Sequence, residues 1–315
     1  MKVSVIIPVY NAESFIEKAV FSALQQKETC EVLLIEDGSS DRSLDACMKL
    51  ADKHEKVKLY RHKNGENRGA AESRNLGIIK SQCDLIAFLD ADDYYLPGRF
   101  SQAKQIMEND VSVDGVYEAI GMHFYDSNAK ALWLQKGGEL LTTLNKTIEP
   151  ENLFPALIEG DVGYLHLDGL VVNKKLFNYC GVFPANLRLH QDTALILKLS
   201  LFGKLVPGRL GTPVALRGIH KDNRITKNDK AAYTNLLLWS SMFEWSRNKR
   251  ISINNTALLY KKLIESNYYY EKSIDSGFSK KSLKPILSLL CIKFVNHPAL
   301  FCISAFHRLL SFIKA

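Results

Sequence analysis

Residues 84–93 read DLIAFLDADD. The run that ends at Leu89 is mostly apolar, which is typical of a strand buried on both faces of a sheet. Three carboxylates, those of Asp90, Asp92 and Asp93, follow it at once. Carboxylates crowded at a strand end repel one another unless a cation neutralises them, and their hard oxygen atoms favour Mg²⁺ or Mn²⁺. The simpler alternative is a solvated acidic turn or a helix N-cap.

Similar strands recur upstream of this stretch. Short apolar runs alternate with helical patterns of ten or more residues, which indicates a mainly parallel sheet flanked by helices. The first ninety residues therefore predict an α/β, Rossmann-like nucleotide-binding layout. The expected strands are Lys2–Ile7, Glu31–Glu36, Val57–Arg61 and Asp84–Leu89. The first expected helix begins near Glu13, the second runs from the N-cap Asp41 to about His54, and the third covers Ala70–Lys80.

Polar residues follow these strands at the edge where parallel sheets bind ligands. Ligands lie beyond the carboxyl ends of the strands, which places Pro8–Asn11, Asp37–Asp41 and Asp90–Asp93 at one edge, and Asn67–Gly69 faces the same end. Their convergence favours a shared site in which Arg74 offsets phosphate charge. Taken singly, Asp37–Asp41 is an ordinary turn and Arg74 is a surface helix residue.

The composition describes an ordinary globular protein. The chain has 315 residues, of which 46% are hydrophobic and 24% charged, close to the roughly 25% charged residues of soluble domains. Its six cysteines form no C-x-x-C pair, so neither a zinc ribbon nor a dense disulfide framework is expected. The first apolar run is too short for a signal peptide. A reducing, cytoplasmic setting fits these features.

The chain changes character twice along its length. After residue 100 the pattern loosens, with a helix to about Asn109 and a strand-like run over Leu165–Val172, and the stretch Ala231–Lys272 reads as helical. We therefore expect a catalytic domain over residues 1–228, with a nucleotide-binding half (1–100) and an acceptor-binding half (101–228). A helical C-terminal region, 229–315, follows.

The positive charge is concentrated in the C-terminal tail. The net charge is +7, and residues 276–315 hold six Lys and Arg residues without a single Asp or Glu. The remainder is nearly neutral, which disfavours a nucleic-acid partner. Residues 299–313 have an amphipathic helical pattern, so we expect residues 283–315 to attach the protein peripherally to an anionic membrane surface at the inner face of the cell membrane. The alternative is that this helix packs on the catalytic domain.

Four segments in order resemble one large family. They are VSVIIPVYNAESFIEKAVFSALQQ (3–26), EVLLIEDGSSDRS (31–43), ENRGAAESRNLGI (66–78) and IAFLDADDYYLPG (86–98), and they look like the inverting nucleotide-sugar glycosyltransferases of family 2, which have the GT-A fold. The resemblance is strong from Val3 to Phe100 and extends more weakly to about His220. It implies a GT-A catalytic domain with a C-terminal helical extension.

The resemblance also implies roles for individual residues on the donor side. Asp37 would accept a hydrogen bond from the uracil ring of a UDP-sugar, and Asp90 and Asp92, a D-x-D motif, would hold Mn²⁺ or Mg²⁺ on the diphosphate. Arg74 would lie near the donor phosphates or the sugar. The full set expected to bind the nucleotide-sugar is Pro8, Tyr10, Glu36, Asp37, Asn67, Arg74, Asp90 and Ala91.

The expected general base lies further along the chain. An inverting transfer needs a group that takes the proton of the acceptor hydroxyl, and Asp192 in LRLHQDTALILKLS (187–200) matches the family position, although Gln191 stands where the family has Glu. The alternative is that Asp192 caps a helix that begins near Thr193. His220, in LRGIHKDNRIT (216–226), would be a third metal ligand or phosphate contact, or simply a solvated loop residue.

Weaker candidates complete the expected site. Arg217 and Arg224 would close over the diphosphate, and His166 and Asp168 would contact the acceptor. The expected activity is transfer of a sugar to a hydroxyl of a saccharide or lipid-linked acceptor in cell-surface polysaccharide synthesis. Two alternatives are a non-catalytic, membrane-tethered sugar-nucleotide binding protein, which Gln191 alone favours, and a sugar-phosphate nucleotidyltransferase. The latter normally needs a Gly-rich basic loop, which PVYNAES (8–14) is not.

Overall fold

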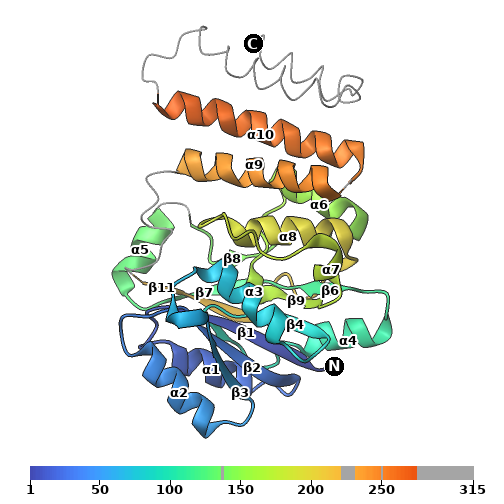
Figure 1. Ribbon diagram of the computed structural model, residues 1–315. Helices are drawn as coiled ribbons and strands as arrows, with labels where there is room; N and C mark the ends of the chain where they lie inside the picture. Colours follow the sequence, from blue (N-terminus) through green and yellow to red (C-terminus); the bar gives the residue numbers. More distant parts are fainter. Residues whose placement is uncertain (136–137, 221–230, 250, 275–315) are drawn as a thin grey trace. The chain divides into compact units, whose positions relative to one another are not determined.

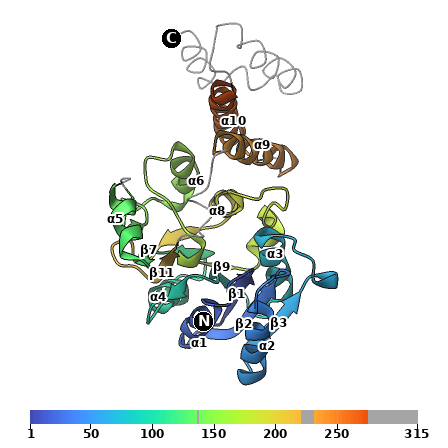
Figure 2. The same cartoon turned by 90° about the vertical axis from the view of Figure 1, so that its left-hand side faces the viewer.

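The computed structural model describes residues 1–135, 138–220, 231–249 and 251–274 (Figures 1 and 2). The chain divides into two compact units, Met1–Lys227 and Asn228–Ala315. The first unit contains the expected nucleotide-binding layout, and each unit is described by itself.

A seven-stranded sheet forms the centre of the first unit. Its order is β10-β6-β9-β4-β1-β2-β3, and β9 alone runs antiparallel to its neighbours β4 and β6. The prediction of a mainly parallel sheet is confirmed. The strands are β1 Val3–Val9, β2 Thr29–Glu36, β3 Val57–Arg61, β4 Leu85–Phe88, β6 Gly115–Tyr117, β9 Leu170–Asn173 and β10 Leu205–Pro207.

Helices bury both faces of this sheet. Along β1 the side chains alternate: Val5 and Ile7 enter the core beneath α1 and α2, and Ile6 enters the core on the α3 side. This two-sided burial explains why the strands read as continuous apolar runs. The helices of this unit are α1 Ile16–Leu24, α2 Ser43–Lys53, α3 Ala70–Lys80, α4 Ser101–Asn109, α5 Ser127–Gln135, α6 Pro150–Glu159, α7 Leu176–Cys180 and α8 Gln191–Phe202.

Two helix starts differ from the sequence prediction for a shared reason. The helix α1 begins at Ile16 rather than near Glu13, and α2 has Arg42 rather than Asp41 at its N-cap. The Asp41 carboxylate instead accepts hydrogen bonds from the backbone N–H of Glu13 (3.2 Å) and of Ser43 (2.9 Å). It therefore joins the loops after β1 and β2 at the carboxyl ends of these strands.

The first unit also contains a second, four-stranded sheet. Its order is β5-β11-β7-β8, with β5 Tyr94–Tyr95, β7 Ile120–Phe124, β8 Leu141–Thr142 and β11 Ala215–Ile219. The pairing of β5 with β11 carries residues near position 217 back to the acidic segment after β4. Residues distant in sequence are thus assembled at one place.

The strand expected over Leu165–Val172 was too long. Only Leu170–Asn173 is a strand, because residues Leu167–Gly169 form a 3₁₀ turn (η2). The side chain of His166 accepts a hydrogen bond from the backbone N–H of Asp168 at 3.3 Å and closes this turn. Local side-chain hydrogen bonding of this kind competes with strand pairing.

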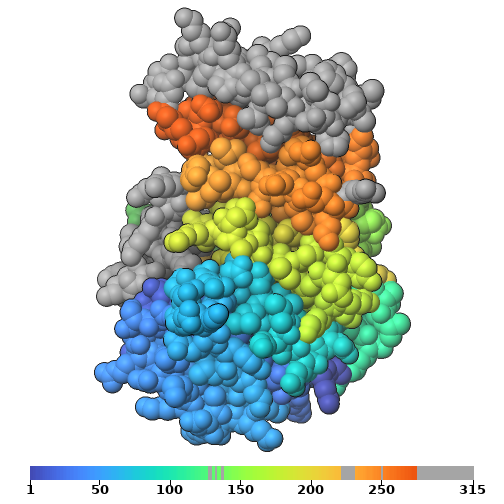
Figure 3. All heavy atoms as spheres, in the orientation of Figure 1, coloured from blue at the N-terminus to red at the C-terminus, as the bar shows by residue number. Residues whose placement is uncertain are grey.

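The helix α3 and the chain around α7 and α8 meet at the surface of the first unit. Figure 3 shows the α3 region and the segment around α7 and α8 side by side. The Asn75 side chain joins them, since its amide donates to the Phe183 carbonyl and accepts from the Phe183 N–H, both at 3.0 Å. This contact positions the chain that leads into α8.

Cysteines 30 and 83 lie together at the opposite edge of the sheet, at the start of β2 and just before β4. They form a disulfide, the only one among the described residues, with Cα atoms 7.3 Å apart, and Cys47 and Cys180 are buried thiols. The cysteine spacing predicted no dense disulfide framework, and a single disulfide agrees with that prediction.

The second unit is a helical hairpin in its described part. The helices are α9 Ala231–Lys249 and α10 Ile253–Ile274. They run antiparallel, because Phe243 lies beside Tyr260 (5.2 Å between ring centroids) and Tyr233 lies beside Tyr270 (5.5 Å). The expected helical stretch is confirmed as two helices. Among the described helices none has the length and apolar character needed to cross a bilayer. The amphipathic stretch 299–313 and Arg224 lie outside the described residues.

Candidate active site

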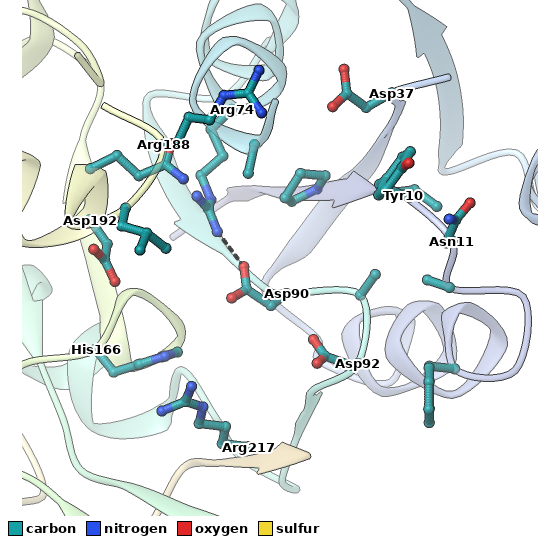
Figure 4. Close-up of a pocket in the computed structure, with 18 of the residues that line it drawn as sticks. Tyr10, Asn11, Asp37, Arg74, Asp90, Asp92, His166, Arg188, Asp192 and Arg217 are labelled. Carbon is teal, nitrogen blue, oxygen red and sulfur yellow. Dashed lines mark hydrogen bonds and ion pairs between the residues drawn. The ribbon is translucent and has the colours of Figure 1, made fainter. Parts of the chain in front are cut away.

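A cavity of about 670 Å³ opens at the carboxyl ends of β1 and β4. Residues from both halves of the first unit line it, as Figure 4 shows. Three members of the expected site, Glu36, Asn67 and Asp168, are not among the lining residues. The expected residues that do line it are Pro8, Tyr10, Asp37, Arg74, Asp90, Ala91, Asp92, His166, Asp192, Arg217 and His220.

Asp37 anchors the loop that precedes α3. Its buried carboxylate accepts hydrogen bonds from the backbone N–H of Arg68 (2.7 Å) and of Gly69 (2.8 Å). The next residue, Gly38, has φ +69°, and a Cβ there would lie 2.7 Å from the Gly65 carbonyl oxygen, so only glycine fits this close approach. The loops after β2 and before α3 therefore meet as one wall of the cavity.

Glu36 has a different role from its neighbour. Its carboxylate is buried, lies 2.7 Å from the Arg61 guanidinium and accepts the Ser39 N–H at 2.5 Å. Burial alone would raise the pKa of Glu36, but the Ser39 and Arg61 contacts outweigh it and lower the pKa. Glu36 thus holds the β2 turn in place from outside the cavity.

Arg74 and Asp90 form a bridge across the cavity floor. The Arg74 guanidinium, on α3, lies 2.5 Å from the Asp90 carboxylate after β4. Burial would raise the pKa of Asp90, but Arg74 and, to a lesser degree, His166 outweigh it, so the pKa is lowered and Asp90 is ionised near neutral pH. The Nε atom of Arg74 is buried and has no hydrogen-bond partner within the described part of the chain. Such an orphan donor points to a ligand atom.

Asp92 and His220 form the neighbouring pair. The His220 Nε2 lies 3.1 Å from the Asp92 carboxylate, and the Phe15 ring stacks on the imidazole with centroids 4.9 Å apart. Both residues line the cavity. The expected partnership of Asp92 with His220 therefore has a basis in the geometry.

The third carboxylate of the acidic segment, Asp93, lies underneath the cavity. It accepts the Gly218 N–H at 2.8 Å and is buried beside the equally buried Asp168. Burial and then the Asp168 carboxylate raise the pKa of Asp93 well above its usual range, and burial raises the pKa of Asp168 as well. Both shifts favour the protonated form of this carboxylate pair. Asp168, expected to contact the acceptor, is fully buried and does not line the cavity.

These residues fit a divalent cation. Asp90 supplies an ionised carboxylate, and Asp92 and His220 add oxygen and nitrogen donors that suit Mn²⁺ or Mg²⁺. Asp90, Asp93 and His166 also offer ligand atoms that all lie within 4.8 Å of one another. Asp93 is the poorer ligand, because its raised pKa favours the protonated form.

The far wall of the cavity carries Asp192. Its helix α8 begins at Gln191 and has His190 as the N-cap, so Asp192 lies in the first turn, where its carboxylate accepts the Thr193 N–H at 2.8 Å. Arg188, which the sequence analysis did not predict, also lines the cavity (Figure 4). The Oε1 atom of the buried Gln191 also has no partner in the described residues.

A family model described as glycosyl transferase family 2 matches residues 4–155. The matched segment covers just under half of the chain and is similar to that family. The resemblance drawn from the four sequence segments is thereby confirmed. The family 2 segment covers the walls formed by Tyr10, Asp37, Arg74 and Asp90, whereas Asp192 lies beyond it.

Similar proteins carry names and structures that agree with the family. A succinoglycan biosynthesis protein, ExoU, from Rhizobium meliloti (strain 1021) is 42% identical over 100 residues, which are 32% of this chain and 29% of that protein. The chain spans only 36% and 26% of the length of the first two curated relatives that it matches.

Two solved structures share the GT-A architecture. Staphylococcus aureus TarS 1–349 in complex with UDP-GlcNAc has a TM-score of 0.65 at 18% identity, covering 90% of this chain and 78% of that one. The mannosyltransferase PcManGT from Pyrobaculum calidifontis, in complex with GDP-Man and Mn²⁺, has a TM-score of 0.55 at 15% identity, covering 94% and 81%. At these identities the likeness establishes the fold of this chain and no more.

Proposed function

We propose that this protein is a metal-dependent, inverting glycosyltransferase that moves a sugar from a nucleotide-sugar to an acceptor hydroxyl. One observation carries the proposal. A single cavity joins a cation-binding edge, formed by Asp90, Asp92 and His220, to a carboxylate on its far wall, Asp192. Those are the two devices that an inverting transfer requires.

The donor is proposed to be a UDP-sugar bound by Mn²⁺ or Mg²⁺. Tyr10 and Asp37 would hold the base at one end of the cavity, and Asp90, Asp92 and His220 would hold the metal ion on the diphosphate. The ion, when bound, supplies positive charge that stabilises the departing nucleotide diphosphate. The complexes of TarS with UDP-GlcNAc and of PcManGT with GDP-Man and Mn²⁺ support this donor class.

The chain's own residues would divide the reaction between them. Asp192 takes the proton of the acceptor hydroxyl while that oxygen forms a bond to the anomeric carbon and the bond from this carbon to the diphosphate oxygen breaks. Attack from the side opposite the leaving group inverts the anomeric configuration. Arg74 keeps Asp90 ionised and fixed, because their contact spans α3 and the end of β4.

The acceptor is proposed to be a saccharide or a lipid-linked saccharide in cell-surface polysaccharide synthesis. The name of ExoU, a succinoglycan biosynthesis protein, supports this assignment. We also propose that the protein is cytoplasmic and attaches peripherally to the inner face of the cell membrane through residues 283–315. Cell fractionation tests this point: removal of residues 283–315 should release the protein to the soluble fraction, and an unchanged distribution would contradict it.

Donor hydrolysis tests the proposed reaction without knowledge of the acceptor. Purified protein incubated with a panel of nucleotide-sugars and Mn²⁺ should slowly release nucleoside diphosphate from one of them, and a chelator should abolish the release. Hydrolysis that persists unchanged in the chelator would contradict metal dependence. Donor binding without turnover, with every acceptor tried, would instead favour a non-catalytic binding protein.

A further inference from the structure

The imidazole of His220 is packed against aromatic side chains from other elements. The Phe15 ring, at the N-cap of α1, stacks on it with centroids 4.9 Å apart and an angle of 25° between the ring planes. The Tyr125 ring, directly after β7, contacts Phe15 at 5.2 Å and lies edge-on to His220 at 6.3 Å, again between centroids. These two rings therefore restrain the plane of the imidazole.

The stacked imidazole directs its Nε2 atom to the acidic segment after β4. This atom lies 3.1 Å from a carboxylate oxygen of Asp92, and Phe15, Asp92 and His220 all line the cavity. Two adjacent ligand atoms on an octahedral cation, with bonds of about 2.1 Å, lie about 3.0 Å apart. A neutral imidazole that carries its proton on Nδ1 presents Nε2 as a ligand. The pair is therefore spaced as two ligands of one ion.

The kind of ligand atom influences which divalent ion such a site favours. Mg²⁺ is a hard cation that takes oxygen ligands, whereas transition-metal ions, Mn²⁺ among them, also accept imidazole nitrogen. The carboxylates of Asp90 and Asp92 offer oxygen to either ion, so the nitrogen of His220 is the ligand that distinguishes between them. A side chain that is already restrained loses less conformational entropy when it binds. Stacking on the ring therefore strengthens the nitrogen ligand.

We propose that Phe15 is a positioning residue that holds His220 as the nitrogen ligand and thereby gives the cation site a preference for Mn²⁺ over Mg²⁺. This inference rests on the proposed metal-dependent transfer and names the ion that its site selects. Phe15 has no ligand atom of its own, so its effect passes through the imidazole. A second aromatic pair on the same helix, Phe21 with His54, has centroids 5.5 Å apart and does not line the cavity, which makes it a matched control.

Metal binding by the full chain tests the proposal without any turnover. Electron paramagnetic resonance of free Mn²⁺ gives the dissociation constant of Mn²⁺, and competition by Mg²⁺ gives that of Mg²⁺. We expect Phe15→Leu to weaken Mn²⁺ binding by about three- to tenfold, the scale of one aromatic pair, and to change Mg²⁺ binding by less than about twofold, because Mg²⁺ gains little from the nitrogen. In a His220→Ala background, Phe15→Leu should have no further effect on either ion, since the two residues act through one ring.

Further variants separate positioning from general damage to the cavity. Phe15→Tyr keeps a stacking ring and should retain the preference for Mn²⁺, and Phe21→Leu should bind both ions like the unmodified protein. Equal losses of Mn²⁺ and Mg²⁺ affinity in Phe15→Leu would overturn the inference, as would a Mn²⁺ loss of the same size with and without His220. An unmodified protein that binds both ions equally well would overturn the inference alone. If it bound neither ion, the metal-dependent transfer itself would be contradicted.

Discussion

The two walls of the cavity differ in how far their charges are already paired within the protein. On the donor wall, Asp37 binds two loop amides and Arg74 binds Asp90. On the opposite wall, the acceptor wall, no carboxylate among the described residues contacts Arg188, and the Asp192 carboxylate accepts the N–H of its own neighbour Thr193 at 2.8 Å. The donor wall lies within the family 2 match and the acceptor wall largely beyond it.

The largest expected effect comes from the acceptor wall. Asp192→Asn removes the proposed base and keeps the size of the side chain, so kcat should fall by roughly 10²- to 10⁴-fold, the usual contribution of a general base. The dissociation constant of UDP with Mn²⁺ should not change, because Asp192 lies on the wall away from the donor. Steady-state kinetics and calorimetry measure the two quantities. An unchanged kcat in Asp192→Asn would contradict the role of Asp192 as the general base.

The next effect belongs to the donor wall. Asp92→Ala removes a proposed metal ligand that lies 3.1 Å from His220, and the affinity for Mn²⁺ should fall by roughly 10- to 100-fold or more. Electron paramagnetic resonance of free Mn²⁺ measures this directly, without any turnover. Asp45→Asn, on the exposed face of α2, is the matched control and should bind Mn²⁺ normally. Equal affinity in both variants would remove Asp92 from the metal site.

A smaller effect tests how rigid the donor wall is. Arg74→Gln leaves Asp90 without its partner and should cost about 1–3 kcal/mol of unfolding free energy, less than a fully buried pair because Asp90 is 32% exposed. The pKa of Asp90 is lowered in the folded state. The stabilisation is therefore present above the unfolded pKa of about 3.9 and is lost as the pH falls through the lower folded value. Denaturant melts from pH 7 to pH 3 should show the two proteins converging, and a constant difference would argue against the ion pair.

The smallest effect is expected at Glu36. The family resemblance implies a base contact there, whereas the structure directs the carboxylate to Arg61, outside the cavity. Glu36→Gln should therefore change the affinity for UDP by less than about threefold, the scale of a substitution that touches no ligand. Asp37→Asn, in the cavity wall, should have the larger effect. A tenfold loss in Glu36→Gln would show that the bound state rearranges this turn.

The sequence predicted the regular half of the fold well, because its patterns are local. Val57–Arg61 and Ala70–Lys80 were placed at their observed bounds, since each combines a clear period with a distinct end. The strand at Leu165–Val172 was overextended, because the hydrogen bond from the Asp168 N–H to the His166 side chain turns the chain. The periodicity of apolar residues does not predict a turn that depends on a single side-chain hydrogen bond.

The site was predictable only where a loop directly follows a strand. Asp37, Asp90 and Asp92 were found because the ends of parallel strands share one edge. Arg188 was missed, because its place in the cavity wall depends on how the chain before α8 packs on α3, through contacts such as that of Asn75 with Phe183. A contact between residues more than a hundred positions apart cannot be predicted from the local patterns of a single sequence.

The most direct test of the central claim is a calorimetric titration of UDP into the unmodified protein, once with Mn²⁺ and once with the metal removed by a chelator. If Asp90, Asp92 and His220 form a cation site for a diphosphate before the nucleotide binds, UDP should bind at least about tenfold more tightly with Mn²⁺, a difference of about 1.4 kcal/mol. Equal affinities under the two conditions would contradict the account.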